Sequence, residues 1–214
     1  MKKLLFLAFV IGTTLSSCSK KSNPKPTNTV TINGASYATV SIGTQTWTSV
    51  NYNGPGGTIN TSLNEAIYGK YYTIAEMQAI SLPTGWRVPT EADFVTLLKS
   101  QGNVTQQSDG TIELASLVSK DLRALSNWDV NGDNSSGFNA EPAGFCYASG
   151  PVFEYLQGTA YFLSSTPSTS SFGGNIALMV VGSIIPLGIT EQASIDPHYG
   201  FINASFTLRF VKDN

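Results

Sequence analysis

The chain is poor in charge, histidine and cysteine, and each scarcity excludes a kind of site. Charged residues make up only 12% of the 214 residues, so uncharged polar side chains supply much of the surface. A zinc site needs several histidine or cysteine ligands, and His198 is the only histidine. We therefore assign His198 to a surface turn. No Gly-x-Ser-x-Gly motif indicates a hydrolase, and no Gly-rich phosphate loop follows a predicted strand.

Basic residues are also scarce outside the N-terminal region. Five of the 12 lysines and arginines precede residue 29, whereas all 14 aspartates and glutamates follow it. Only seven basic residues therefore remain to balance 14 acidic ones in the rest of the chain. Because nucleic-acid binding requires a basic footprint, we exclude nucleic acid as a partner.

The N-terminal region has the parts of a bacterial lipoprotein signal. Lys2 and Lys3 precede an apolar stretch that is too short to span a bilayer as a helix. Leu15-Ser16-Ser17-Cys18 then resembles a lipoprotein cleavage and acylation site. We predict a signal peptide over residues 1–17 and lipidation of Cys18. The alternative is an ordinary cleaved signal that happens to be followed by a cysteine.

Residues 18–28 form the predicted tether, and residues 29–214 form the predicted single domain. The tether has no large apolar side chain to bury, and its prolines and lysines predict an extended, solvated segment. The predicted location is the cell envelope, with the lipid of Cys18 in the outer membrane. The periplasmic face is slightly favoured over the cell surface because the residues after Cys18 are basic.

Local sequence signals predict an α+β domain with short helices and antiparallel sheets. Asn33-Gly34 lies between two β-like segments and is typical of a hairpin. A capping box at Thr73 predicts a helix that ends near Ile80. Thr90-Glu91-Ala92-Asp93 is predicted to open a second helix, which Gly102 ends. A third helix is predicted from apolar residues at helical spacing, namely Leu114, Leu117, Val118, Leu122 and Leu125. Further strands are predicted at residues 145–148, 160–163, 176–181 and 206–211. Strands at the two ends of the chain can then pair.

Five motifs in register resemble those of one bacterial family. They are Val40-Ser41-Ile42-Gly43-Thr44-Gln45-Thr46-Trp47, Pro83-Thr84-Gly85-Trp86-Arg87-Val88-Pro89-Thr90, Gly137-Phe138-Asn139-Ala140-Glu141-Pro142-Ala143-Gly144, Leu163-Ser164-Ser165-Thr166 and Leu208-Arg209-Phe210-Val211-Lys212-Asp213. Through them the chain resembles the Fibrobacter succinogenes major paralogous domain family over residues 30–213. The resemblance implies a secreted, often lipid-anchored domain, with a fold similar to the C-type-lectin-like architecture of formylglycine-generating enzymes. It implies no particular activity.

The chain departs from the family pattern at two positions where the resemblance implies cysteines. Leu82 and Phe210 stand at these positions. Because both cysteines are absent together, we hypothesise that they are bonded in relatives and that Leu82 and Phe210 contact each other here. Burial of both side chains would contribute about 3–5 kcal/mol, similar to the ~2–4 kcal/mol of a disulfide.

Two arginines and a tryptophan of the motifs are predicted to be structural. A planar guanidinium can hold two carboxylate or carbonyl groups at once, so Arg87 and Arg209 are expected to brace the fold. Glu91 and Glu141 are the candidate partners, and contact with a ligand is the alternative. Trp86 lies in an apolar context and is expected in the core.

Asp129, Asn131 and Asp133 place oxygen side chains at alternate positions of one loop. Such alternation lets carboxylate and amide oxygens converge on a hard cation, so the loop is a candidate calcium site. The distal bidentate glutamate of a calcium loop is missing. We therefore favour the alternative, an Asx/Gly-rich turn, and we predict no other cofactor.

Tyr161, Phe162 and Phe172 flank a Ser/Thr-rich loop and are predicted to be exposed. Carbohydrate-binding modules stack exposed aromatic faces on sugars, so these three residues are the candidate ligand contacts; burial is the alternative. Cys146 lies in a strand-like run and is predicted to be a buried, unreactive thiol.

Three classes of function remain. We predict a non-catalytic, lipid-anchored binding or adhesion module of the cell envelope that recognises a glycan or a protein. A structural envelope or assembly subunit without a small ligand is the alternative. An oxidase related to formylglycine-generating enzymes is the third class, but the resemblance implies a cysteine pair for that chemistry. Only Cys146 is available if Cys18 is acylated.

Overall fold

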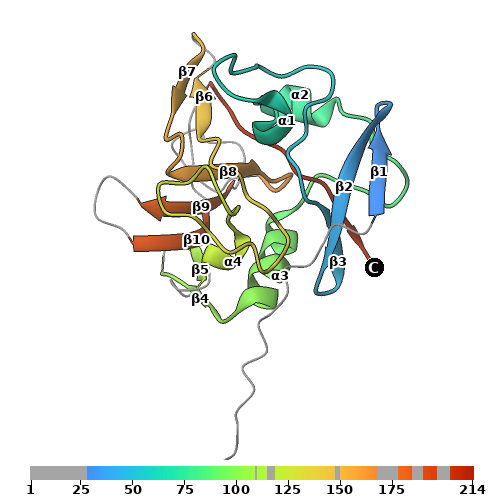
Figure 1. Cartoon of the computed structure of the whole chain (residues 1–214). Coiled ribbons are helices and arrows are strands. Elements are labelled where there is room, and N and C mark those ends of the chain that lie inside the picture. The colour runs from blue at the N-terminus through green and yellow to red at the C-terminus, as the bar shows by residue number, and fades with distance from the viewer. Residues whose placement is uncertain are drawn as a thin grey trace, which may run out of the picture.

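The computed structural model describes most of the chain from residue 28 to the C-terminus. The described residues are 28–108, 110–114, 119–147, 150–167, 178–184, 190–196 and 203–214. They form antiparallel sheets and a few short helices, which confirms the α+β class (Figure 1). The signal peptide, Cys18, most of the tether, Phe172 and His198 lie outside the described residues. No helix within the described ranges has the length and apolar character that a membrane span requires.

The first sheet joins the two ends of the described chain. It contains β1 (Asn28–Ile32), β2 (Ala35–Ile42), β3 (Gln45–Thr48) and β12 (Val211–Asp213), in the order β1-β2-β3-β12. Asn33 and Gly34 have φ angles of 47° and 82°, as the predicted two-residue hairpin requires. β12 pairs with β3 and sets Val211 opposite Trp47, so strands from the two ends pair as expected.

Two further sheets follow, of five and three strands. One contains β4 (Val104–Gln106), β5 (Ile112–Leu114), β10 (Thr190–Asp196), β9 (Leu178–Ile184) and β8 (Thr159–Leu163), in that order. The other contains β11 (Ala204–Ser205), β6 (Phe145–Tyr147) and β7 (Val152–Glu154). Parallel bridges from Ala160 to Gly144 and from Phe162 to Thr207 connect β8 to this last sheet.

Four short helices are present among the described residues. They are α1 (Glu65–Tyr68), α2 (Ile74–Gln78), α3 (Glu91–Gln101) and α4 (Ser119–Leu122). The capping boxes at Thr73 and Thr90 open α2 and α3 as predicted, and Gly102 ends α3. Phe94 of α3 stacks on Trp47 of β3 with ring centroids 5.4 Å apart. This contact fixes α3 against the first sheet.

The predicted third helix is wrong. Leu114 belongs to β5, which pairs with both β4 and β10. Leu125 is 57% exposed, and only the single turn of α4 is helical; Leu117 and Val118 lie outside the described residues. The apolar spacing matched a helix, but pairing with a distant strand gives the backbone of β5 a ladder of hydrogen bonds. Tertiary pairing of this kind overrides a local pattern.

Candidate functional site

Arg87 of the Pro83–Thr90 motif connects helix α3 to the C-terminal strand. Its guanidinium donates to both carboxylate oxygens of Asp93, at 3.1 and 2.6 Å, and to Asp213 at 2.8 Å. Glu91, one of the two candidate partners, is therefore not the acid that Arg87 binds: Asp93 sits at the third position of the capping box and is buried. Burial raises the pKa of Asp93, but hydrogen bonds from Arg87 and Thr90 outweigh burial and hold that pKa below its usual range.

Arg209 is fully buried and braces the interior through neutral acceptors. Its guanidinium donates to four oxygens at 2.6–2.9 Å, namely Asn51 Oδ1 and the carbonyls of Thr48, Phe138 and Asn139. The charge also lies over the rings of Phe138 and Phe162, 4.9 and 5.5 Å from their centroids. Because the guanidinium is completely buried and donates to these four oxygens, Arg209 has the environment of a structural residue.

Glu141, the other candidate partner, forms no ion pair with either arginine among the described residues. Its carboxylate instead accepts hydrogen bonds from the side-chain amides of Asn127 and Asn139, at 3.0 and 3.2 Å. Burial raises the pKa of Glu141, although the amides and the charge of Arg209 oppose the shift. The two charges thus influence each other across the interior without contact.

Trp86 is less buried than expected. It is half-buried and packs against the cluster that contains Phe210, whereas Trp47 is completely buried. The ammonium of Lys212 lies 5.7 Å from the centroid of the Trp86 ring, a distance at which a cation and an aromatic face attract each other. Trp86 therefore closes the edge of the core near β12.

The predicted exposure of Tyr161 and Phe162 is wrong. Both belong to β8, every residue of which is buried, and they are 4% and 0% exposed. β8 pairs with β9 along one edge and forms parallel bridges along the other, and the burial of all its alternating side chains shows that both of its faces are covered. Neither ring can stack on a ligand from this position, and Phe172 lies outside the described residues.

Two of the three candidate calcium ligands, Asn131 and Asp133, are engaged by the chain itself. Asn131 Oδ1 accepts from the backbone of Trp128, and Asp133 accepts from the backbone of Ser135 and pairs with Lys120 at 3.2 Å. Within the described ranges, no group of three or more His, Cys, Asp or Glu residues could hold a metal ion. These contacts are those of an Asx/Gly-rich turn, and calcium at Asp129, Asn131 and Asp133 stays a prediction.

Cys146 lies in β6 and is 1% exposed. Burial raises the pKa of its thiol, which disfavours the thiolate that nucleophilic and redox chemistry require. Cys146 is therefore suited to packing rather than to reaction.

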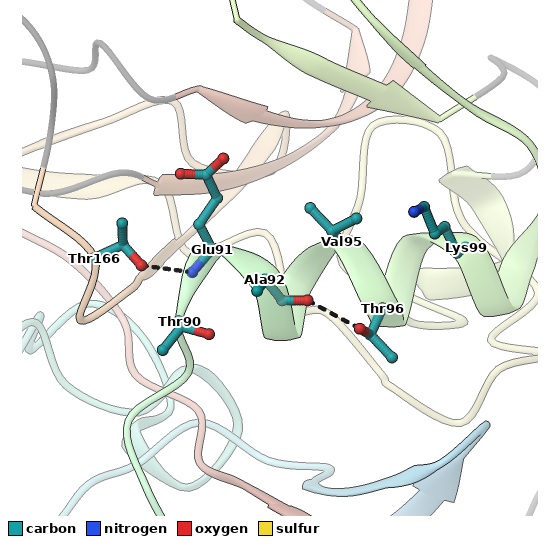
Figure 2. Close-up of a pocket in the computed structure, with 7 residues that line it drawn as sticks. All are labelled: Thr90, Glu91, Ala92, Val95, Thr96, Lys99 and Thr166. Carbon is teal, nitrogen blue, oxygen red and sulfur yellow. Dashed lines mark hydrogen bonds between the residues drawn. The ribbon is translucent and has the colours of Figure 1, made fainter.

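An open groove of about 620 Å³ runs along the outer face of α3. It is lined by Thr90, Glu91, Ala92, Val95, Thr96, Lys99 and Thr166. Figure 2 shows the side chains of Glu91, Val95 and Lys99 along one side of the helix. The Thr166 hydroxyl accepts a hydrogen bond from the backbone of Glu91 at 2.9 Å and so closes one end of the groove.

Tyr155 is the exposed aromatic residue that stands out among the described residues. It follows β7, is 43% exposed and has a φ of 57°, the left-handed region that bulky side chains avoid. Its ring lies 5.7 Å from Phe145 and 6.4 Å from Tyr161, both of which are buried. One side of the ring is thus supported from below, and the rest faces solvent.

Hydrogen bonds hold the Tyr155 turn rigidly in place. The Tyr155 carbonyl accepts from Thr159, and the backbone of Gln157 donates to Pro142 and accepts from Asp129. Gly144 lies directly beneath the turn, where a Cβ atom would clash with the carbonyl oxygen of Glu154. A left-handed bulky residue costs about 1–3 kcal/mol, so the surroundings must impose this conformation.

The comparison with family models decides what kind of chain this is. The model of the Fibrobacter succinogenes major domain matches residues 27–212. The chain belongs to the Fibrobacter succinogenes major domain family. No curated protein and no solved structure gives a match. The matched span of this Fibrobacter succinogenes major domain includes both arginine braces, the α3 groove and the Tyr155 turn.

Leu82 and Phe210 of this Fibrobacter succinogenes major domain lie in one hydrophobic cluster. Phe210 is fully buried, and Leu82 packs against the same cluster in a half-buried position. This arrangement is compatible with apolar replacement of a disulfide. Direct contact between the two side chains stays a prediction.

Two features of the Fibrobacter succinogenes major domain were missed in the sequence. Tyr155 carries no local signal, because an ordinary tyrosine gives no hint that its backbone is left-handed. The α3 groove could have been found, since Glu91, Val95 and Lys99 recur at helical spacing in a row beside that of Phe94 and Leu98.

Proposed function

We propose that this Fibrobacter succinogenes major domain is a non-catalytic binding module of the cell envelope that holds a glycan through Tyr155. The proposal rests on one observation: an aromatic ring is 43% exposed at a turn whose strained backbone is held rigidly. Strain of this kind concentrates at ligand-binding and active sites. The proposed fold is the C-type-lectin-like architecture that the family resemblance implies.

The chemistry around Tyr155 suits a sugar ring. A hexose has an apolar C–H face that can lie on an aromatic ring, and its hydroxyl groups need hydrogen-bond partners at the ring edge. Glu154 and Gln157 are exposed neighbours in the chain; a carboxylate accepts hydrogen bonds, and an amide both donates and accepts them. Val152, 53% exposed, extends the apolar surface next to the turn.

The proposed location follows from the N-terminal residues. Acyl chains on Cys18 would hold the protein at the outer membrane, with residues 18–28 as a short basic tether. The tether spans at most ~3.3–3.6 Å per residue, or roughly 35 Å, so the binding module would work close to the membrane surface, with the periplasmic face favoured. A Cys18→Ala change should release the protein from the membrane fraction.

An oxidase is disfavoured by the state of Cys146. That thiol is buried and its pKa is raised, so it offers neither an accessible nucleophile nor a ready thiolate.

Binding of the chain from residue 27 onward to a glycan array tests the proposal. A central aromatic anchor contributes more than about 1–2 kcal/mol, so Tyr155→Ala should weaken binding at least about tenfold. Tyr155→Phe keeps the ring and serves as the matched control, with little change expected. Equal binding by the alanine variant, or silence across the array together with capture of a protein, contradicts the glycan proposal.

A further inference from the structure

The groove on α3 is the face of one helix with a regular charge pattern. Six of its seven lining residues lie on or cap α3. Glu91, Val95 and Lys99 follow one another at intervals of four residues, which places them in one row along the helix (Figure 2). The row therefore has an acid at one end, an apolar residue in the middle and a base at the other end.

This row is complementary to itself. Each charge lies four residues from Val95, or about 6 Å along the helix axis. A twofold axis beside Val95 would therefore bring Glu91 of one copy opposite Lys99 of the other, and the reverse. No ion pair joins Glu91 or Lys99 to another residue within the described part of the chain.

We infer that the α3 face docks a second copy of this chain in antiparallel orientation. Val95 packs against Val95 of the partner subunit, and Glu91 and Lys99 form two symmetric ion pairs across the interface. Such an isologous contact closes as a dimer and leaves no surface for further growth. The inference is independent of the glycan site proposed at Tyr155.

The packing around the row permits two helices to approach. In the commonest helix packing, the i, i+4 rows of two helices lie side by side at roughly 50°. The neighbouring row on α3 contains Ala92 and Thr96, whose small side chains leave a shallow groove for the row of a partner. The Thr96 hydroxyl already donates to the carbonyl of Ala92 at 2.9 Å, so it needs no partner across the interface.

The helix is rigid enough to present this face without rearrangement. Its N-terminus is fixed by Asp93, which accepts from Arg87, Thr90 and Gln45. Phe94 and Leu98 lie on the adjoining face of the helix and are buried in the core, and the half-buried Val95 packs against the edge of the same cluster. A single short helix buries less area than the ~1,200–2,000 Å² of a stable interface, so the dimer is weak and forms at high local concentration.

Cross-linking of the full chain tests the contact at its centre. Residue 95 lies beside its own copy in the inferred dimer, so Val95→Cys should give a disulfide-linked dimer under mild oxidation of membranes or concentrated protein. Ala66→Cys, on the exposed side of α1, is the matched control and should stay monomeric. Cross-linking no faster than the control, or cross-linking to a different protein, overturns the inference.

Exchange of charges tests the symmetry. E91K places lysines at both ends of the row, and K99E places glutamates there, so each variant alone should lose the Val95→Cys cross-link at least tenfold. Mixed together, the two variants regain opposite charges at both contacts and should cross-link as a heterodimer at the original level. Circular dichroism melts of both variants report whether each is folded. Failure of the mixture of two folded variants to recover overturns the antiparallel arrangement.

Discussion

The arginine braces and the Tyr155 turn each contain an energetically unfavourable feature, but their surroundings compensate it to different extents. Arg209 is a fully buried charge, yet four oxygens and two aromatic rings surround it. Tyr155 has a strained backbone conformation, and its side chain is 43% exposed. At Arg209 the surroundings compensate the unfavourable charge. At Tyr155 the surroundings impose the strained backbone conformation, and only part of the tyrosine ring packs against the protein in return.

This difference separates residues that hold the fold from residues available to a ligand. Natural sequences break local rules mainly at functional or strained sites. Arg87 and Arg209 lie in two of the family motifs, and their partners all belong to the domain. A structural role is therefore enough to explain why these motifs contain arginine. Tyr155 lies outside those motifs, and a structural role does not explain why its ring is exposed.

The largest expected effect is at Arg209. An Arg209→Met change fills similar volume but leaves three buried carbonyls and Asn51 without a donor. Each unsatisfied group costs about 1–3 kcal/mol, so the free energy of unfolding should fall by about 4 kcal/mol in urea titrations. Arg209→Lys keeps the charge but cannot reach four acceptors. Its free energy of unfolding should lie between those of the wild-type protein and the methionine variant. Stability unchanged in the methionine variant would contradict the role of a brace.

Gly144→Ala should have the next largest effect. The new Cβ atom would clash with the Glu154 carbonyl, and the backbone at Gly144 has a φ of 60°. We expect a loss of about 2–4 kcal/mol from the clash and the strain together. Gly85→Ala is the control, since Gly85 has a φ of 83° but open space around it, and should lose only about 1–2 kcal/mol. Equal losses of stability in the two variants would show that the close approach of the Glu154 carbonyl does not restrict the residue at position 144.

Asp93→Asn should remove about 2 kcal/mol and change the response to acid. Hydrogen bonds to a charged group contribute about 1.5–3 kcal/mol. The pKa of Asp93 is lower in the folded state than in the unfolded state. Its contribution is therefore fully present above the unfolded pKa of about 3.9 and is lost as pH falls through the folded value. The free energy of unfolding should therefore fall less on acidification in Asp93→Asn than in the wild-type protein, as urea titrations at several pH values would show.

Asp213→Asn provides the control for Asp93. Asp213 also pairs with Arg87, but its side chain is 72% exposed. Exposed pairs contribute about 0–1 kcal/mol, so this variant should change stability little. A loss as large as that of Asp93→Asn would mean that the ion pair with β12, rather than the helix cap, dominates the network.

The smallest effect on stability is expected at Tyr155. A Tyr155→Gly change relieves about 1–2 kcal/mol of left-handed strain and loses a similar amount of packing on Phe145 and Tyr161, so unfolding should shift by less than about 1 kcal/mol. Phe153→Gly, which removes a ring that packs on Tyr71, should instead cost about 3–5 kcal/mol. A comparable loss at Tyr155 would place it with the braces.

Features defined by neighbouring residues could be predicted from the sequence, and features defined by distant ones could not. The Asn33-Gly34 hairpin and the capping boxes at Thr73 and Thr90 depend on a few adjacent side chains, and all three are present. The burial of Tyr161 depends instead on strands and bridges from elsewhere in the chain. For the same reason, nothing local distinguishes Tyr155 from any other tyrosine.

The pairing of β12 with β3 has a consequence for the order of folding. The first sheet gains its last strand only when residues 211–213 reach residues 45–47, so most of the domain must be synthesised before this sheet is complete. Contacts between such distant residues also slow folding. The first sheet of such a chain therefore closes only after nearly all of the domain has left the ribosome, so its completion is one of the last steps in the birth of the protein.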